Sequence, residues 1–155
     1  MSKIVPPEKL EDFIKTLRTT KKKIVTLNGS FDLLHAGHLY ILREAKNQGD
    51  FLILALNSDE SVRKNKGDKR PIIPLPYRIQ MVASLEMVDY VTWFEEEDPR
   101  ALLKTIRPDV HVNGAEYGPN CIEAETVKKY GGKLHLALRL PSLSTSEIIA
   151  KIKDL

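Results

Sequence analysis

The sequence predicts an α/β fold: a single Rossmann-like domain with a five-stranded parallel sheet and helices on both faces. Short apolar runs alternate along the chain with segments of helical periodicity, which is typical of parallel strands joined by crossover helices. Residues 51–56, FLILAL, are apolar without interruption, as expected of a strand that is covered on both faces. The length of 155 residues suits one domain that buries its own core.

The N-terminal segment is expected to be helical. Pro6 and Pro7 are followed by Glu8, a pattern typical of a helix start, and apolar residues then fall on one face as far as Arg18. We therefore expect residues 1–22 to be an N-terminal helical appendage. The main domain would then occupy residues 23–155.

The next elements are a strand, a helix and a second strand. Residues 24–27 form a short apolar run, and residues 39–48 carry apolar side chains at helical spacing before a glycine. After the strand at residues 51–56, polar residues can cap a short helix that begins at Glu60. Residues 63–71 are basic, contain a glycine and have no apolar period, which predicts a mobile loop.

The second half of the chain repeats this alternation, with proline and glycine at the boundaries. The expected strands are residues 88–94, 110–113 and 133–138, and the expected helices are residues 76–86, 99–106, 122–130 and 144–152. In such sheets ligands bind beyond the carboxyl ends of the strands, where the strand order reverses. The loops expected to meet there are residues 28–38, 57–66, 113–117 and 141–146.

Two histidines follow the first strand after a sharp turn. Asn28-Gly29 tolerates unusual backbone angles, and His35 and His38 then fall at the start of a helix, with Gly37 between them. Free backbone N–H groups and the positive end of the helix dipole lie at the same place. Gly37 lets a phosphate approach the backbone, and an imidazole donates hydrogen bonds in either charge state. This turn therefore predicts a phosphate site.

The same histidine pair has two other possible interpretations, a metal site and a structural pair. A metal site would need further ligands, and the sequence has neither an HExxH motif nor a cysteine cluster to supply them. A merely structural pair is the second alternative. We expect no metal ligands from the protein.

Two further polar segments could contact phosphate. Ser144, Thr145 and Ser146 open the last helix; they fit a helix cap, but three hydroxyls exceed what a cap requires and suggest a second phosphate cradle. The basic residues of the loop at 63–71 are either solvated surface charge or a flap over a polyanion.

Composition excludes several classes of protein. The net charge of +3 is too small to indicate nucleic-acid binding, and no apolar run approaches the length of a membrane span. Cys121, the one cysteine, excludes an internal disulfide and suits a cytoplasmic protein. No Walker motif, GxGxxG fingerprint or nucleophile elbow is present. The remaining groups suit direct phosphoryl or nucleotidyl transfer without a covalent nucleophile.

At this point the sequence resembles a known family. NGSFDLLHAGH is similar to the signature of the HxGH nucleotidyltransferase superfamily, and STSEII to its C-terminal serine/threonine motif. Between them, KGDKRPIIPLPYR and SLEMVDYV resemble segments of the D-glycero-β-D-manno-heptose 1-phosphate adenylyltransferases. Members of this branch are often fused to a sugar kinase. This chain resembles the stand-alone form. It transfers AMP from ATP to heptose 1-phosphate and yields the ADP-heptose used for lipopolysaccharide.

The resemblance also implies roles for individual residues. The implied catalytic residues are His35, His38 and Lys66. The implied ATP-binding residues are Asn28, Gly29, Ser30, Phe31, Asp32, Gly37, Asn113, Gly114, Glu116, Ser144, Thr145 and Ser146, among which Asp32 would brace the turn. Lys64 and Arg78 would contact the acceptor phosphate, or Arg78 would hold the flap.

Mg²⁺ would enter as Mg-ATP, and a homodimer or higher homo-oligomer is expected, with neither nucleic acid nor membrane as partner. An alternative is a cytidylyltransferase that acts on glycerol 3-phosphate or an amino-alcohol phosphate. A nucleotide-binding regulator without turnover is another, although the retained histidines and hydroxyls argue against it.

Overall fold

A five-stranded, all-parallel sheet forms the centre of the computed structural model, which describes residues 2–140 and 143–155. Pro141 and Ser142, within the predicted loop at residues 141–146, lie outside the described residues. The strands are β1 (Ile24–Gly29), β2 (Phe51–Asn57), β3 (Tyr90–Phe94), β4 (Val110–Gly114) and β5 (Lys133–Ala137). Their spatial order is β3-β2-β1-β4-β5, and each neighbouring pair is parallel. The predicted fold class is confirmed.

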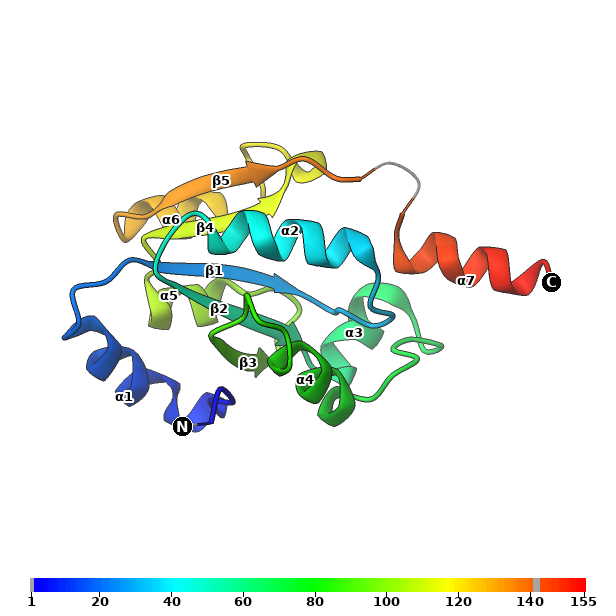
Figure 1. The fold of residues 1–155 in the computed structure, drawn as a ribbon, viewed down its shortest axis with the longest axis horizontal. Coiled ribbons are helices and arrows are strands. Elements are labelled where there is room, and N and C mark those ends of the chain that lie inside the picture. The colour runs from blue at the N-terminus through cyan, green and yellow to red at the C-terminus, as the bar shows by residue number, and fades with distance from the viewer. Residues whose placement is uncertain (1, 141–142) are drawn as a thin grey trace.

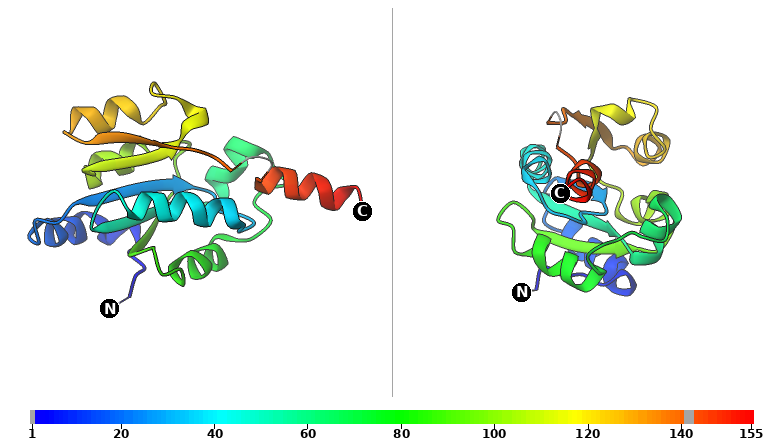
Figure 2. Two further views of the ribbon diagram at one scale, coloured as in Figure 1. Left: turned by 45° about the horizontal axis from the view of Figure 1, so that its top comes forward. Right: turned by 90° about the vertical axis from the view of Figure 1, so that its right-hand side faces the viewer.

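Helices cover both faces of this sheet (Figure 1). They are α1 (Pro7–Arg18), α2 (Ala36–Lys46), α3 (Asp59–Lys66), α4 (Leu75–Ala83), α5 (Arg100–Ile106), α6 (Ala124–Lys129) and α7 (Thr145–Lys153), with a short 3-10 helix η1 at Ala115–Tyr117. In Figure 1, α2 and α4 lie in front of the sheet and α1, α5 and α6 lie behind it. Figures 1 and 2 show α7 extending beyond the body of the domain.

The core is divided between the two faces because successive strand residues point to opposite sides. Val25 and Leu27 of β1 join a cluster that includes Leu42 of α2. Ile24 of β1 and Ile53 of β2 belong to a second cluster, toward α1 and α5. Each fully buried aliphatic side chain contributes about 1.5–3 kcal/mol to folding. Both faces therefore hold β1 firmly, and β1 leads directly into the histidine turn.

The N-terminal segment packs on the main fold. Leu10, Ile14 and Leu17 of α1 are buried in the second cluster. Before α1, the backbone of residues 3–5 pairs in parallel with Val91, because Val5 N donates to Val91 O and Val91 N donates to Lys3 O, both at 2.8 Å. This bridge covers the exposed edge of β3.

The prediction of a mobile loop at residues 63–71 is wrong for its first part, because α3 continues to Lys66. Ser58 caps this helix by accepting a hydrogen bond from Ser61 N at 3.1 Å. Its first turn is acidic and its last turn is basic, which complements the helix dipole at both ends. Cap and charge stabilise the helix where the absence of an apolar period suggested a loop.

Candidate active site

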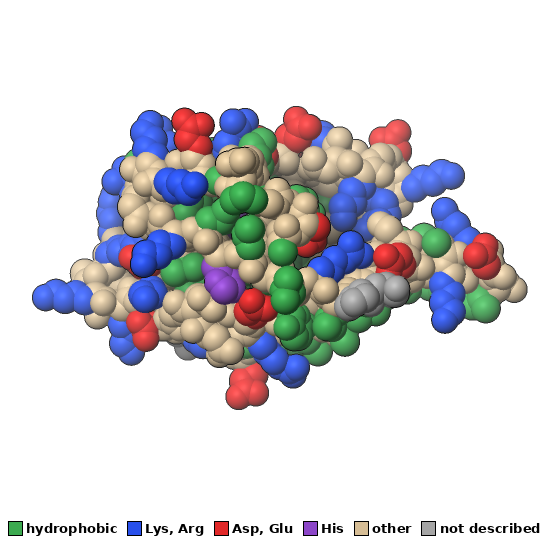
Figure 3. Space-filling model, turned by 90° about the horizontal axis from the view of Figure 1, so that it is seen from above, with side chains coloured by type: hydrophobic (Ala, Val, Ile, Leu, Met, Phe, Trp, Pro, Cys, Tyr) green, Lys and Arg blue, Asp and Glu red, His purple; other side chains and the backbone are tan. Residues whose placement is uncertain are grey.

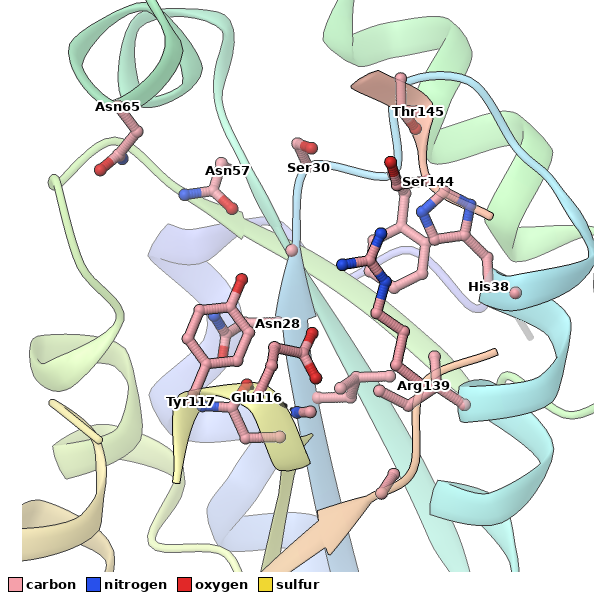
Figure 4. Close-up of a pocket in the computed structure, with 18 of the residues that line it drawn as sticks. Asn28, Ser30, His38, Asn57, Asn65, Glu116, Tyr117, Arg139, Ser144 and Thr145 are labelled. Carbon is pink, nitrogen blue, oxygen red and sulfur yellow. Dashed lines mark hydrogen bonds between the residues drawn. The ribbon is translucent and has the colours of Figure 1, made fainter. Parts of the chain in front are cut away.

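A cavity of about 950 Å³ opens at the carboxyl ends of the strands. The strand order reverses there, since β2 and β4 lie on opposite sides of β1. Its lining comes from the ends of several strands, from the start of α2, from α3 and from the start of α7. Figure 4 shows these groups around one space. The histidine turn and the start of α7, about a hundred residues apart in the sequence, thus border a single cavity.

The histidine turn is ordered by its own backbone. His35 is the N-cap of α2, and its Nδ1 accepts from Gly37 N at 3.1 Å. His38 Nδ1 accepts in turn from His35 N at 3.2 Å. The two rings stack with centroids 3.8 Å apart. Because backbone N–H groups occupy both Nδ1 atoms, a neutral ring at either position carries its proton on Nε2.

Both rings are held in the neutral form. Burial, and then the neighbouring charges of His35 and Lys66, lowers the pKa of His38 to about 4. Burial, followed by repulsion from Arg139, lowers the pKa of His35, and Glu147 opposes this shift. Near pH 7 the site therefore offers two neutral Nε2–H donors. Gly37 is needed at this place because a Cβ there would lie 2.9 Å from the His35 ring.

The start of α7 is attached to the histidine loop. Thr145 Oγ1 donates to Leu33 O at 3.1 Å, and this hydroxyl is buried. Ser144 is the N-cap and accepts from Glu147 N at 3.1 Å. Ser146 is exposed and lines the cavity. Thr145 therefore positions the helix start, while Ser144 and Ser146 present hydroxyls to the cavity.

Lys66 approaches the same cavity from α3. Its Nζ lies 3.3 Å from Ser30 Oγ, at the start of the loop that follows β1. The side chain as a whole is exposed, but its ammonium group lies at the cavity wall. Partial desolvation there, followed by repulsion from Arg70, lowers the pKa of Lys66. An anion bound beside it would relieve both effects.

Asn28, Gly29, Ser30, Phe31 and Gly37 also line the cavity. Phe31 has a left-handed backbone (φ 48°), and its ring lies 4.7 Å from that of His38. This ring forms the wall behind the second imidazole.

Three of the predicted contact residues do not line the cavity. Asp32 is fully buried, and its carboxylate accepts from Arg70 Nε and from the backbone N–H groups of residues 72 and 73. Burial alone would raise the pKa of Asp32, but these hydrogen bonds outweigh it and lower the pKa. Asp32 therefore braces the turn and has no oxygen free for a ligand.

Arg78 is also fully buried. Its guanidinium donates to Ile73 O, Ser30 O and Asn57 O and pairs with Asp59 Oδ1, all at 2.7–2.8 Å. It holds the segment after α3 against the strand ends, instead of the acceptor-phosphate position expected from the sequence. Lys64 is not among the residues that line the cavity, and its Nζ pairs with Glu60 Oε1 at 3.4 Å.

The opposite end of the cavity lies at β4 and β5. Asn113, Gly114 and Glu116, which the resemblance implies are ATP-binding residues, line it. The Glu116 carboxylate folds over Gly114, where any Cβ would clash with it. Buried Glu123 accepts from Asn113 Nδ2 at 3.3 Å. This end therefore presents carboxylates, in contrast to the donors at the histidine turn.

Sequence reasoning missed several lining residues. Arg139 extends from the chain after β5 toward Ser144 and His38 (Figure 4), and it pairs with Glu147 at 3.4 Å. Tyr117 and Glu123 lie at the β4 end. The signal for Arg139 was its position: a basic residue directly after a strand whose carboxyl end faces the ligand edge. Glu123 gave no such signal, because it belongs to no motif.

Charges around the domain are mixed. Lys and Arg side chains alternate with Asp and Glu over the face seen in Figure 3. Within residues 2–140 and 143–155, no three His, Cys, Asp or Glu side chains are grouped so that they could hold a metal ion. No helix in the described part of the chain has the length and apolar character to cross a membrane.

This chain matches a known protein family and several known proteins. The family model described as cytidylyltransferase-like matches residues 26–151. The bifunctional protein HldE of Geobacter metallireducens is 43% identical over 152 residues, which cover 97% of this chain and 31% of that protein. HldE of Alcanivorax borkumensis is 42% identical over 142 residues, covering 91% and 30% of the two chains. The chain thus spans about a third of the length of these relatives.

Solved structures agree on the fold. The lipopolysaccharide core biosynthesis protein of Thermoplasma volcanium superposes with a TM-score of 0.63 at 29% identity, covering 77% of this chain and 97% of that one. The pantoate-β-alanine ligase of Francisella tularensis gives a TM-score of 0.64 at 19% identity, covering 100% and 79%. The second likeness concerns the fold alone.

Proposed function

Because this chain belongs to the cytidylyltransferase-like family of nucleotidyltransferases, we propose that it transfers AMP from ATP to D-glycero-β-D-manno-heptose 1-phosphate. The products are ADP-heptose and pyrophosphate. The names of the relatives support this acceptor, since they include HldE and a lipopolysaccharide core biosynthesis protein. The segments KGDKRPIIPLPYR and SLEMVDYV, which resemble those of the heptose 1-phosphate adenylyltransferases, point to the same acceptor.

The proposed reaction is a direct displacement. An oxygen of the heptose phosphate attacks the α-phosphorus of ATP, a new P–O bond forms, and the bond from the α-phosphorus to the bridging oxygen breaks. Pyrophosphate leaves with the electron pair of that bond. Mg²⁺ arrives with ATP as part of the substrate and offsets charge on its phosphates. No covalent enzyme intermediate forms.

The side chains act by positioning and by charge stabilisation. His35 and His38 donate their Nε2–H groups to phosphate oxygens as charge shifts toward the leaving pyrophosphate. Lys66 and Arg139 add positive charge from two sides. Ser144, Ser146 and the free N–H groups of α7 bind the β- and γ-phosphates. Asn113 and Glu116 contact the nucleoside.

One observation carries the proposal: two neutral imidazoles and the start of α7 border the same cavity as Lys66. This arrangement offers many hydrogen-bond donors to a polyphosphate and contains no activated nucleophile. It suits transfer at phosphorus better than hydrolysis through an enzyme-bound intermediate.

The test is a screen of pyrophosphate release with ATP and CTP against heptose 1-phosphate, glycerol 3-phosphate and ethanolamine phosphate. We expect release with ATP and heptose 1-phosphate to exceed every other pair by at least tenfold. A preference for CTP with an alcohol phosphate would replace this proposal with the cytidylyltransferase alternative. The expected homodimer is tested separately by light scattering of the eluting protein.

A further inference from the structure

Two asparagines form a wall of the cavity on the side away from Arg139 (Figure 4). Asn57 is the last residue of β2, and Asn65 lies on α3 two turns later. Neither residue belongs to the motifs that marked the phosphate site. Both contact Ser61, which is fully buried between them.

The contacts with Ser61 fix which way each amide points. Ser61 Oγ donates its proton to Glu96 O at 2.6 Å, so it can only accept from Asn57 Nδ2, at 3.0 Å. Asn65 Nδ2 donates to Ser61 O and to Glu97 O, each at 2.9 Å. A flipped amide would set carbonyl oxygen against carbonyl oxygen at Asn65. The network therefore determines both orientations.

As a consequence, the wall presents mainly acceptors. Both Nδ2 hydrogens of Asn65 and one of the two on Asn57 Nδ2 are used within the protein, and neither Oδ1 receives a hydrogen bond from the described part of the chain. Two carbonyl oxygens that line one wall of the cavity match two hydroxyl donors. They do not match a phosphate, which has only acceptor oxygens in its ionised form.

The two ends of the cavity differ in a way that assigns them to different ligands. The β4–β5 end has an aromatic ring and apolar side chains, Tyr117, Ile122 and Leu138, which suit a flat nucleobase. The described residues lining the β2–α3–β3 side include no aromatic ring; they are amide, charged and small apolar side chains. Such a surface suits a polyhydroxylated molecule without a flat ring.

We infer that Asn57 and Asn65 form the subsite for the hydroxyl groups of the acceptor, so that the enzyme selects a polyhydroxylated sugar phosphate over a short alcohol phosphate. The inference rests on the proposed function, because it concerns the second substrate of that reaction. Lys66, the neighbour of Asn65 on α3, then lies where the phosphate of the same acceptor meets ATP. The bound hydroxyls orient the attacking oxygen.

The test compares Asn57→Ala and Asn65→Ala with Asn120→Ala, an exposed asparagine outside this cavity. We expect each cavity variant to raise the KM for heptose 1-phosphate about fivefold, and both together by about 20-fold, as for the loss of one or two neutral hydrogen bonds. The KM for ATP should stay within twofold, and the control should match wild type. Thermal melting confirms that each variant is folded.

A second arm separates recognition from structure. Monodeoxy analogues of heptose 1-phosphate are assayed with wild type and with each variant. With wild type, the analogue that lacks a contacted hydroxyl should react about fivefold less well than heptose 1-phosphate. With the matching variant, the analogue and heptose 1-phosphate should react equally well, since the two losses are coupled. A structural effect of the substitution would leave the preference between analogues unchanged.

Binding of heptose 1-phosphate in the presence of α,β-methylene-ATP is measured by calorimetry and does not require turnover. Tight binding without pyrophosphate release would contradict the proposed function and leave the subsite standing. Normal turnover with unaltered acceptor KM in both variants would overturn the subsite alone. A rise in the KM for ATP instead would assign the wall to the ribose and overturn it as well.

Discussion

Two polar clusters include residues of the loop after β1. They differ in whether their hydrogen-bonding groups are used within the protein or face the cavity. The first is the brace, formed by Asp32 and Arg78, in which buried charges use their oxygens and nitrogens on the protein itself. The second is the donor cluster, formed by His35, His38 and Lys66, whose remaining donors face the cavity. Charge does not distinguish the two clusters. Unused hydrogen-bonding capacity beside a cavity does.

The largest effect on stability is expected in the brace. Arg78→Met keeps the volume but leaves three carbonyl oxygens without their donor and removes the guanidinium partner of Asp59. We expect a loss of about 3–5 kcal/mol in the free energy of unfolding, measured by urea denaturation. A loss below about 1 kcal/mol would show that the brace is dispensable, and the contrast between the clusters would break.

A substitution in the donor cluster should lower turnover and leave the stability of the fold nearly unchanged. His38→Ala removes one donor to the developing charge, so kcat is expected to fall about 10²–10³-fold while ATP affinity changes little. Steady-state kinetics with ATP and heptose 1-phosphate provide the measurement, and the urea midpoint serves as the control. Unchanged turnover in a folded variant would remove this histidine from the mechanism.

Acid should weaken the fold through buried histidines. Burial lowers the pKa of His111 to about 4, and its Nδ1 pairs with Thr26 Oγ1 at 2.8 Å. Between pH 6.5 and 4 the unfolded chain binds a proton that the folded His111 does not, so stability falls as the pH falls through that range. The contribution is on the order of 3 kcal/mol per such histidine.

His111→Leu sharpens this prediction, because it removes the titrating group while remaining apolar. The variant should lose stability less steeply than wild type between pH 6.5 and 4 in urea titrations, although its stability at pH 7 falls with the loss of the Thr26 contact. Parallel pH profiles for the two proteins would refute the assignment to His111. His38, with its own pKa of about 4, keeps part of the slope in both.

The smallest expected effect is on kcat/KM, and it distinguishes two lysines of α3. Lys66→Ala should reduce kcat/KM about 10–100-fold, as for a hydrogen bond to a charged group. Lys64→Ala should change it by less than twofold, because the partner of this side chain among the described residues is Glu60, in an exposed ion pair. Equal losses in the two variants would indicate a general effect of positive charge and not a specific contact.

The sequence allowed the fold to be predicted where patterns are local. The apolar run at residues 51–56 and the turn before His35 each specify their structure within a few residues. The end of α3 was misjudged, since its stability comes from a cap and from end charges and not from an apolar face. The role of Arg78 depended on partners far along the chain, such as Ser30, which no local pattern reveals. Arg139 was missed although its position after a strand was a signal.

The central claim, that two neutral imidazoles grip the triphosphate, is tested most directly by nitrogen-15 NMR of the histidine rings at pH 7. The signals of His35 and His38 are assigned by their alanine variants. The account predicts neutral rings protonated on Nε2, with both Nε2 signals shifting on addition of Mg-ATP and remaining in place with adenosine. Protonated rings in the free protein, or signals that ignore Mg-ATP, would contradict it.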